Sequence, residues 1–258
     1  MTRLALGFSL LAVSTVARAD IMTKTIEYKE GDTVLEGFLA YDSSGPARRP
    51  GVLVYHQWMG LTGYERMRAE QLAKLGYVAL AADIYGKGVR PSSPKEAAAE
   101  AGKYRGNVAL LRARTQAALT ALRQQPNVLP EKIAAIGYCF GGGAALELAR
   151  SGADLLGVVS FHGTLGTPNP QDAKNIRGKV LVLHGAEDPG QPRAAVEALE
   201  DELTKAGVDW QVVLYSGVVH AFTQPDAGSD KSKGVAYDAK ADKRSFQAMK
   251  DFLAELFG

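Results

Sequence analysis

The stretch that decides the fold is Gly137-Tyr138-Cys139-Phe140-Gly141, which follows an apolar run at 133–136 and opens onto a helix-forming segment at 142–149. Strand, sharp turn and helix in this order are the context of a nucleophile elbow, where Gly-x-Ser-x-Gly usually places a serine on a strained turn. Cys139, the only cysteine of the chain, stands in the position of that serine. The flanking glycines suit a turn that leaves no room for a Cβ atom beside the neighbouring backbone.

The position of Cys139 also bears on its reactivity. Free backbone N–H groups and the helix dipole at the N-terminus of the following helix favour a thiolate, which is the reactive form of cysteine. The alternative interpretation is a small buried apolar residue, which is what most free cysteines are. The agreement between strand, glycine pair and helix favours the nucleophile.

Residues 1–19 have the pattern of a secretory signal peptide. Met1-Thr2-Arg3 gives a positive start, Leu4–Val16 is an apolar stretch, and Ala17-Arg18-Ala19 is a small-x-small cleavage site before Asp20. The apolar stretch is shorter than the ~20 residues of a membrane-spanning helix, so an uncleaved anchor is the less favoured alternative. We therefore expect a periplasmic or secreted protein without membrane insertion after cleavage.

Composition narrows the class further. A single cysteine cannot form an internal disulfide, so the hydrophobic core must stabilise the mature chain, which we expect to form one domain over residues 20–258. The formal net charge of +2 and the absence of a basic stripe argue against a nucleic-acid partner. No His/Asp/Glu set has metal-ligand spacing, and Gly141-Gly142-Gly143 lacks the Lys-Ser/Thr of a phosphate loop, so we expect no metal and no cofactor. The sequence leaves the oligomeric state open, with a monomer plausible.

Hydrophobic patterning predicts a three-layer α/β domain with an eight-stranded, mostly parallel sheet and helices on both faces. The first two predicted strands alternate, at Thr23–Lys29 and Thr33–Tyr41. Six continuous apolar runs follow, at Gly51–His56, Tyr77–Asp83, Lys132–Gly137, Leu156–Phe161, Lys179–His184 and Trp210–Tyr215. Helical patterns cover Tyr64–Leu75, Asn107–Gln125, Phe140–Ser151, Arg193–Ala206 and about Lys240 to Phe257. Ligand sites in such sheets lie at the carboxyl ends of the strands.

A base and an orienting acid for Cys139 stand after two later strands. Asp188 follows the run 179–184, and His220 follows the run 210–215. Nucleophile, acid and histidine in this chain order predict a catalytic triad. Glu187 competes with Asp188 for the acid, and we favour Asp188 because the longer turn before it lets the side chain return toward the histidine. The N–H of Phe140 and one N–H from the turn at 56–61 are the expected oxyanion donors.

With these motifs the chain resembles the dienelactone hydrolase family of the α/β-hydrolase superfamily. The resemblance rests on residues 52–61, 76–88, 137–142, 184–188 and 220–222, and spans nearly the whole mature chain. It implies an α/β-hydrolase fold and the hydrolysis of a small carboxylic ester or lactone through an acyl-enzyme on the cysteine, with no metal or cofactor. It also implies that Trp58 supplies the second oxyanion N–H.

The chain departs from the family at two places. Gln57 stands where the family usually has a glutamate that interacts with the cysteine, and glutamine cannot titrate. Activation of the thiol would then fall on His220 and the helix N-terminus. Lys87 and Gln224 stand where members that cleave dienelactone use arginines to hold its carboxylate, so dienelactone itself is not implied as the substrate.

We expect five residues to line the substrate site: Gln57, Lys87, Tyr138, His162 and Phe222. For His162, which ends a predicted strand, a hydrogen-bonded loop histidine is an equal alternative. Two long loops, at 84–106 with its basic residues and at 223–236, are candidates for the pocket rim. The alternative function is a non-catalytic small-molecule-binding protein on the same scaffold, which Gln57 favours and the complete triad opposes.

Overall fold

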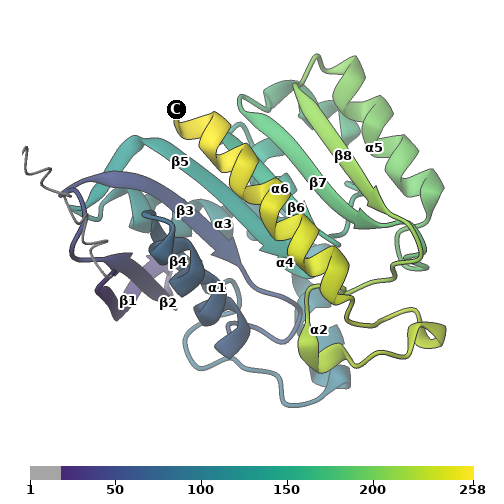
Figure 1. The fold of residues 1–258 in the computed structure, drawn as a ribbon, viewed down its shortest axis with the longest axis horizontal. Coiled ribbons are helices and arrows are strands. Elements are labelled where there is room, and N and C mark those ends of the chain that lie inside the picture. The colour runs from purple at the N-terminus through teal and green to yellow at the C-terminus, as the bar shows by residue number, and fades with distance from the viewer. Residues whose placement is uncertain (1–18) are drawn as a thin grey trace, which may run out of the picture.

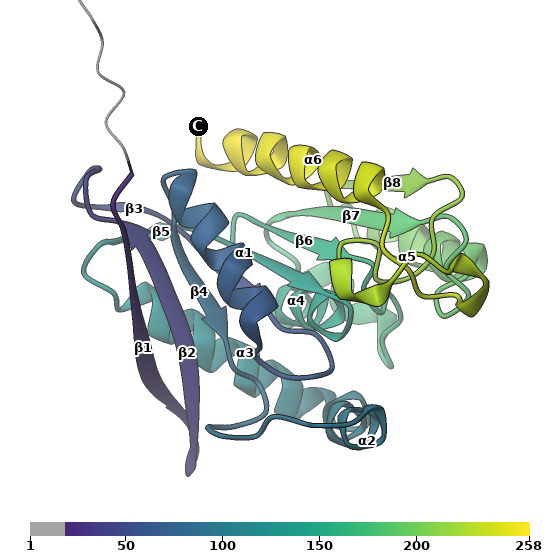
Figure 2. The ribbon, with the colours of Figure 1, turned by 60° about the horizontal axis from the view of Figure 1, so that its bottom comes forward.

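The computed structural model describes residues 19–258, and these form one eight-stranded sheet in the order β1-β2-β4-β3-β5-β6-β7-β8. Only the β1–β2 and β2–β4 pairs are antiparallel, and the remaining neighbours are parallel. The strands are β1 (Ile21–Glu30), β2 (Thr33–Asp42), β3 (Arg49–Tyr55), β4 (Val78–Ala82), β5 (Val128–Tyr138), β6 (Gly157–Phe161), β7 (Lys179–Gly185) and β8 (Trp210–Tyr215). The predicted mostly parallel sheet with an antiparallel N-terminal edge is confirmed (Figure 2).

Helices cover both faces of the sheet, and α6 runs across one of them (Figure 1). The α-helices are α1 (Gly63–Lys74), α2 (Pro94–Arg105), α3 (Val108–Arg123), α4 (Phe140–Arg150), α5 (Arg193–Lys205) and α6 (Ala239–Phe257). Short 3-10 helices lie at η1 (Pro170–Asn175), η2 (Pro225–Ala227) and η3 (Lys231–Lys233). One apolar core joins α1 and α6 to the sheet, and the other joins α2, α3, α4 and α5 to the opposite face.

Strand β3 shows how the sequence serves both cores. Leu53 and Tyr55 pack into the core under α3 and α4, and Val52 and Val54 pack into the core under α1 and α6. All four are fully buried. Successive side chains of a strand point to opposite faces, so a strand that lies between two helical layers must be apolar throughout.

Helix α2 is the one α-helix that the sequence analysis did not predict, because the segment from 84 to 106 was interpreted as a long loop. The helix begins after Ser93, whose hydroxyl accepts the N–H of Glu96, and Pro94 occupies the first turn. Ser-Pro-x-Glu ahead of an alanine-rich run is a helix start signal, so the information was present in the sequence. Strand β5 also begins earlier than predicted, at Val128 rather than Lys132.

The predicted signal peptide lies outside the described residues except for Ala19. Asp20 lies beside the end of β2, since its N–H donates to Asp42 Oδ1 at 3.0 Å and its carbonyl accepts the N–H of Ser43. Within residues 19–258, no helix is both long enough and apolar enough to cross a membrane.

Candidate active site

Cys139 lies on a strained turn between β5 and α4. Its backbone has φ 54° and ψ −117°, a left-handed conformation that non-glycine residues seldom adopt. The turn is as tight as the glycine pair predicts, because a Cβ on Gly137 would lie 1.9 Å from the carbonyl oxygen of Gly141. A Cβ on Gly141 would lie 2.2 Å from the carbonyl oxygen of Tyr55. The strained backbone thus brings the thiol to the end of the sheet, where it is partly exposed.

The structure brings the three predicted triad residues together. His220 Nε2 lies 3.2 Å from Cys139 Sγ, and His220 Nδ1 lies 2.7 Å from Asp188 Oδ2. The three residues follow β5, β7 and β8, whose carboxyl ends meet at one edge of the sheet. This is the geometry in which a base contacts the nucleophile and an acid orients the base.

Backbone contacts hold both the acid and the base in place. The second oxygen of Asp188, Oδ1, accepts the N–H of Gly190 at 2.8 Å and that of Gln191 at 3.3 Å. His220 pairs with the loop before α6, donating its N–H to Gly234 and accepting the N–H of Ala236, both at 3.1 Å. Asp188 is buried, whereas its competitor Glu187 is exposed to solvent.

The electrostatics of the three groups are linked. Burial disfavours a charge on His220, but hydrogen bonds to Asp188 and Cys139, together with their charges, raise its pKa to about 10. Burial likewise opposes ionisation of Cys139, yet the contact with His220 and the N–H of Phe140 lower the pKa of the thiol. Burial raises the pKa of Asp188, but the hydrogen bond and charge of His220 together with the N–H of Gly190 outweigh it, so the pKa falls below its ordinary value. These directions favour a thiolate beside an imidazolium.

The turn after β3 begins against the first turn of α4, since a Cβ on Gly141 would lie 2.6 Å from the carbonyl oxygen of His56, and three hydrogen bonds hold the turn. The hydroxyl of Tyr85 donates to the carbonyl oxygen of Trp58 at 2.9 Å. The N–H of Gln57 donates to Glu65 Oε1 at 3.2 Å, and the same carboxylate accepts the N–H of Thr62 at 2.8 Å. Within residues 19–258, the N–H groups of Trp58 and Phe140 have no acceptor on the backbone outside their own elements. The N–H of Phe140 is directed at the sulfur of Cys139, where an oxyanion donor is needed.

Three of the residues expected to line the substrate site do not reach the cleft. Tyr138, His162 and Phe222 are fully buried, and they form a layer beneath the triad. His162 donates to or accepts from Thr223 Oγ1 at 2.8 Å, and its ring packs edge-on against that of His220 at 5.2 Å. Phe222 contacts His162 in turn, at a ring separation of 5.1 Å. The ring of His162 supports the orientation of His220, and His162 is the hydrogen-bonded histidine of the alternative interpretation.

Lys87 and Gln57 also lie elsewhere than expected. The amine of Lys87 pairs with Glu27 on the exposed surface, and Lys87 does not line the cleft. Gln57 is buried and lines another cavity of about 390 Å³, together with Trp58 and Gln224, and Val235 lines both this cavity and the cleft over Cys139. The resemblance to the family could not predict where these two side chains point, because their direction depends on residues of other helices and strands.

A cleft of about 530 Å³ opens onto the triad. Cys139, Asp188 and His220 form its floor, and it is lined further by Arg105, Thr164, Pro189, Gly190, Gln191, Lys233, Gly234 and Val235. The two long loops thus contribute to the rim as predicted, through Arg105 and through residues 233–235. Thr164 and Gln191 were missed, since neither carries a sequence signal that distinguishes it from an ordinary loop residue.

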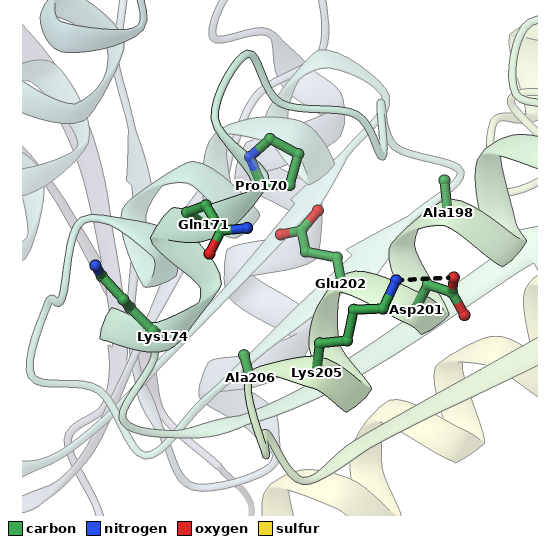
Figure 3. Close-up of a pocket in the computed structure, with 8 residues that line it drawn as sticks. All are labelled: Pro170, Gln171, Lys174, Ala198, Asp201, Glu202, Lys205 and Ala206. Carbon is green, nitrogen blue, oxygen red and sulfur yellow. Dashed lines mark hydrogen bonds and ion pairs between the residues drawn. The ribbon is translucent and has the colours of Figure 1, made fainter.

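Another cavity, drawn in Figure 3, lies between η1 and α5 and contains no triad residue. Three of its charged groups are paired: Lys205 with Asp201 at 3.3 Å, and Glu202 with Arg150 at 2.7 Å. Within residues 19–258, no group of three or more His, Cys, Asp or Glu side chains is arranged to hold a metal ion. The cleft over Cys139 is therefore the candidate active site.

Comparison with known proteins agrees with this geometry. The family model described as "Dienelactone hydrolase family" matches residues 35–257. A protein of Synechocystis sp. that carries the name "Putative carboxymethylenebutenolidase" is 30% identical over 241 residues, covering 88% of this chain and 97% of the relative. The solved structure of P91, a dienelactone hydrolase-like promiscuous phosphotriesterase from metagenomic libraries, is 42% identical with a TM-score of 0.89 and covers 93% of this chain and 100% of that one.

A second solved structure, m3DLH, is 41% identical with a TM-score of 0.89, and covers 92% of this chain and 99% of that one. The predicted fold and family are both confirmed. The chain has the α/β-hydrolase fold and belongs to the dienelactone hydrolase family of hydrolases.

Proposed function

We propose that this protein hydrolyses a small carboxylic ester or lactone with Cys139 as the nucleophile, through an acyl-enzyme. The observation that carries the proposal is the unbroken contact from Asp188 through His220 to Cys139, at 2.7 and 3.2 Å. The family assignment makes a hydrolase the better reading than a non-catalytic binding protein on the same scaffold.

In the first half-reaction the Cys139 thiolate attacks the substrate carbonyl carbon. The carbonyl oxygen gains negative charge and is held by the N–H groups of Trp58 and Phe140. When the tetrahedral intermediate collapses, His220 donates its Nε2 proton to the leaving oxygen, and the alcohol departs. A thioester on Cys139 and a neutral His220 remain.

In the second half-reaction His220 removes a proton from water, and the resulting hydroxide attacks the thioester carbon. The intermediate expels the Cys139 thiolate and releases the carboxylic acid. His220 now carries the proton again, so the thiolate–imidazolium pair is restored. Asp188 stabilises the imidazolium throughout and holds the ring in the tautomer that presents Nε2 to the sulfur.

The test is the hydrolysis of p-nitrophenyl acetate by the mature chain. We expect turnover, and we expect iodoacetamide to abolish it in proportion to the alkylation of one thiol. Cys139→Ala should remove turnover while leaving the thermal unfolding curve close to that of the wild type. Activity that survives complete alkylation would show that another residue is the nucleophile.

A phosphotriester is a second candidate substrate. The observation that favours it is the 42% identity to P91, which is described as a promiscuous phosphotriesterase. Paraoxon hydrolysis measured beside p-nitrophenyl acetate separates the two, since both release p-nitrophenol. A phosphotriester rate that exceeds the ester rate would replace the carboxylic ester as the main proposal.

We also propose that the chain is exported and cleaved before Asp20. In support, the backbone nitrogen of Asp20 lies 3.0 Å from Asp42 Oδ1. Cleavage would convert this nitrogen into an ammonium group, which a neighbouring carboxylate stabilises. N-terminal sequencing of protein from the exported fraction of its host should begin at Asp20, and full-length protein confined to the cytosol would overturn the proposal.

A further inference from the structure

A second cavity of about 330 Å³ adjoins the cleft over Cys139. Arg105 and Thr164 line both spaces, so the two share a wall. The remaining lining of the second cavity comes from the start of α3, the first turns of α4 and the loop after β6: Val108, Leu111, Phe140, Gly143, Ala144, Glu147, Gly166, Thr167 and Pro168.

The surface of this cavity is largely apolar. Its one buried ionisable side chain, Glu147, is already engaged, since Oε2 accepts from Arg112 at 2.7 Å and Oε1 from Arg150 at 3.0 Å. The guanidinium of Arg105 lies over the ring of Phe140, with 5.9 Å between its central carbon and the ring centroid. An apolar group bound here would leave water without leaving a buried polar group unpaired.

The position of His220 decides which half of an ester reaches this cavity. The leaving oxygen must come within hydrogen-bond distance of His220 Nε2, and His220 and Asp188 line the cleft but not the second cavity. Phe140, whose N–H is the proposed oxyanion donor, lines the second cavity. A leaving group beside His220 therefore occupies the cleft, and the adjoining second cavity, which the ring of Phe140 lines, is left for the acyl arm.

We propose that this cavity is an acyl pocket that binds a neutral, apolar acyl arm, so that the enzyme selects esters of medium-chain or aromatic carboxylic acids over those of acetic acid. The largely apolar lining favours an acyl arm without charge, because a charged arm would lose its hydration there. The proposal rests on the function proposed above, and it assigns the two sides of the substrate to two different surfaces.

Two isomeric esters test the assignment directly. Ethyl hexanoate and hexyl acetate contain the same atoms, but only the first carries its long chain on the acyl side. We expect kcat/KM for ethyl hexanoate to exceed that for hexyl acetate by about tenfold, because burying about two of the four additional methylene groups of the hexanoyl chain is worth that factor. Equal rates, or a preference for hexyl acetate, would overturn the proposal.

Variants at the start of α3 test whether this cavity sets the preference for the acyl chain. Val108 lines the cavity and is half-buried, whereas Ala109 is exposed and does not line it. Val108→Phe should lower the ratio of p-nitrophenyl hexanoate to p-nitrophenyl acetate turnover by about tenfold, because the added ring fills the space that two methylene groups occupied. The matched control, Ala109→Phe, should leave the ratio unchanged. Val108→Ala should move the preferred chain length upward, which checks the proposal without overpacking.

The outcomes separate this proposal from the function on which it rests. If the esters are turned over and iodoacetamide stops the reaction, the Cys139 mechanism stands. If Val108→Phe and Ala109→Phe then change the chain-length preference equally, only the acyl pocket is overturned. If no ester is turned over, or alkylation leaves turnover intact, the proposed function fails before the pocket is considered.

Discussion

The phenolic hydroxyl of Tyr85 donates a 2.9 Å hydrogen bond to the carbonyl oxygen of Trp58, the residue proposed to supply the second oxyanion N–H. The two residues follow neighbouring strands, β4 and β3, so the contact links the turns at two strand ends. A peptide unit fixed at its carbonyl side has a fixed orientation, and oxyanion donors act through such preorganisation. Tyr85 is in this way a positioning residue for the active site.

Tyr85→Phe should lower kcat against p-nitrophenyl acetate by about tenfold with a smaller change in KM, because a loosened Trp58 N–H weakens transition-state binding. The control is Tyr104→Phe, since the hydroxyl of Tyr104 donates a 3.1 Å bond to the carbonyl oxygen of Tyr85. Each variant loses one hydrogen bond and about 1 kcal/mol of unfolding free energy. Equal losses of kcat in the two variants would contradict a specific role for Tyr85.

Asp188→Asn should reduce kcat/KM by at least about 100-fold, because the amide presents a donor where His220 Nδ1–H needs an acceptor. Glu187→Gln makes the same chemical change one residue earlier, on an exposed side chain, and should leave the rate within about twofold of the wild type. Steady-state kinetics of both variants on one ester decides between the two carboxylates. A large loss in Glu187→Gln with none in Asp188→Asn would reverse the assignment.

The elbow glycines predict a large difference between two glycine-to-alanine variants. Gly137→Ala places a Cβ 1.9 Å from the carbonyl oxygen of Gly141, and it should cost more than about 4 kcal/mol of unfolding free energy or prevent folding. Gly102→Ala, in the exposed interior of α2, has no heavy atom within 4 Å and should gain about 0.5–1 kcal/mol. Urea unfolding of both variants is the measurement. A well-folded Gly137→Ala would mean that the turn is less tight than described.

The lowered pKa of Cys139 predicts the pH dependence of its alkylation. A thiol with a lowered pKa remains a thiolate at pH values where an ordinary cysteine, with a pKa of ~8.5, is protonated. The rate of iodoacetamide alkylation should therefore stay high as the pH is lowered below 8.5. His220→Ala removes the cation beside the sulfur, so its alkylation rate should fall at higher pH than that of the wild type. Identical profiles that follow a free thiol would contradict the thiolate–imidazolium pair.

The triad could be predicted from the sequence because each of its members has a local signal. Cys139 lies between two glycines at a strand–helix junction, and Asp188 and His220 each follow a buried apolar run. Because the apolar runs are parallel strands, the residues that follow them lie at the same edge of the sheet, where ligand sites form. Strands that are connected by helices have few possible arrangements, so the proximity of the three triad residues could be predicted from the sequence pattern.

The substrate side of the site could not be predicted in the same way. Tyr138 and Phe222 neighbour triad residues in the sequence, yet their side chains point into the core between the sheet and helices α1 and α6. The residues that do line the cleft and its neighbouring cavity, such as Arg105 and Val108, come from the junction of α2 and α3. Their placement depends on how α2 packs against Tyr85 and Phe140, and no local pattern in the sequence encodes that packing.

The mass of the enzyme during turnover tests the central claim most directly. We expect acid quenching of a reaction with p-nitrophenyl hexanoate to trap a species heavier than the free enzyme by one hexanoyl group. Peptide mapping should place that group on Cys139 as a thioester, which hydroxylamine removes. His220→Ala should fail to accumulate the species at the wild-type rate, since deprotonation of the thiol then lacks its base. Turnover with no acylated enzyme, or with the acyl group on a residue other than Cys139, would contradict the account.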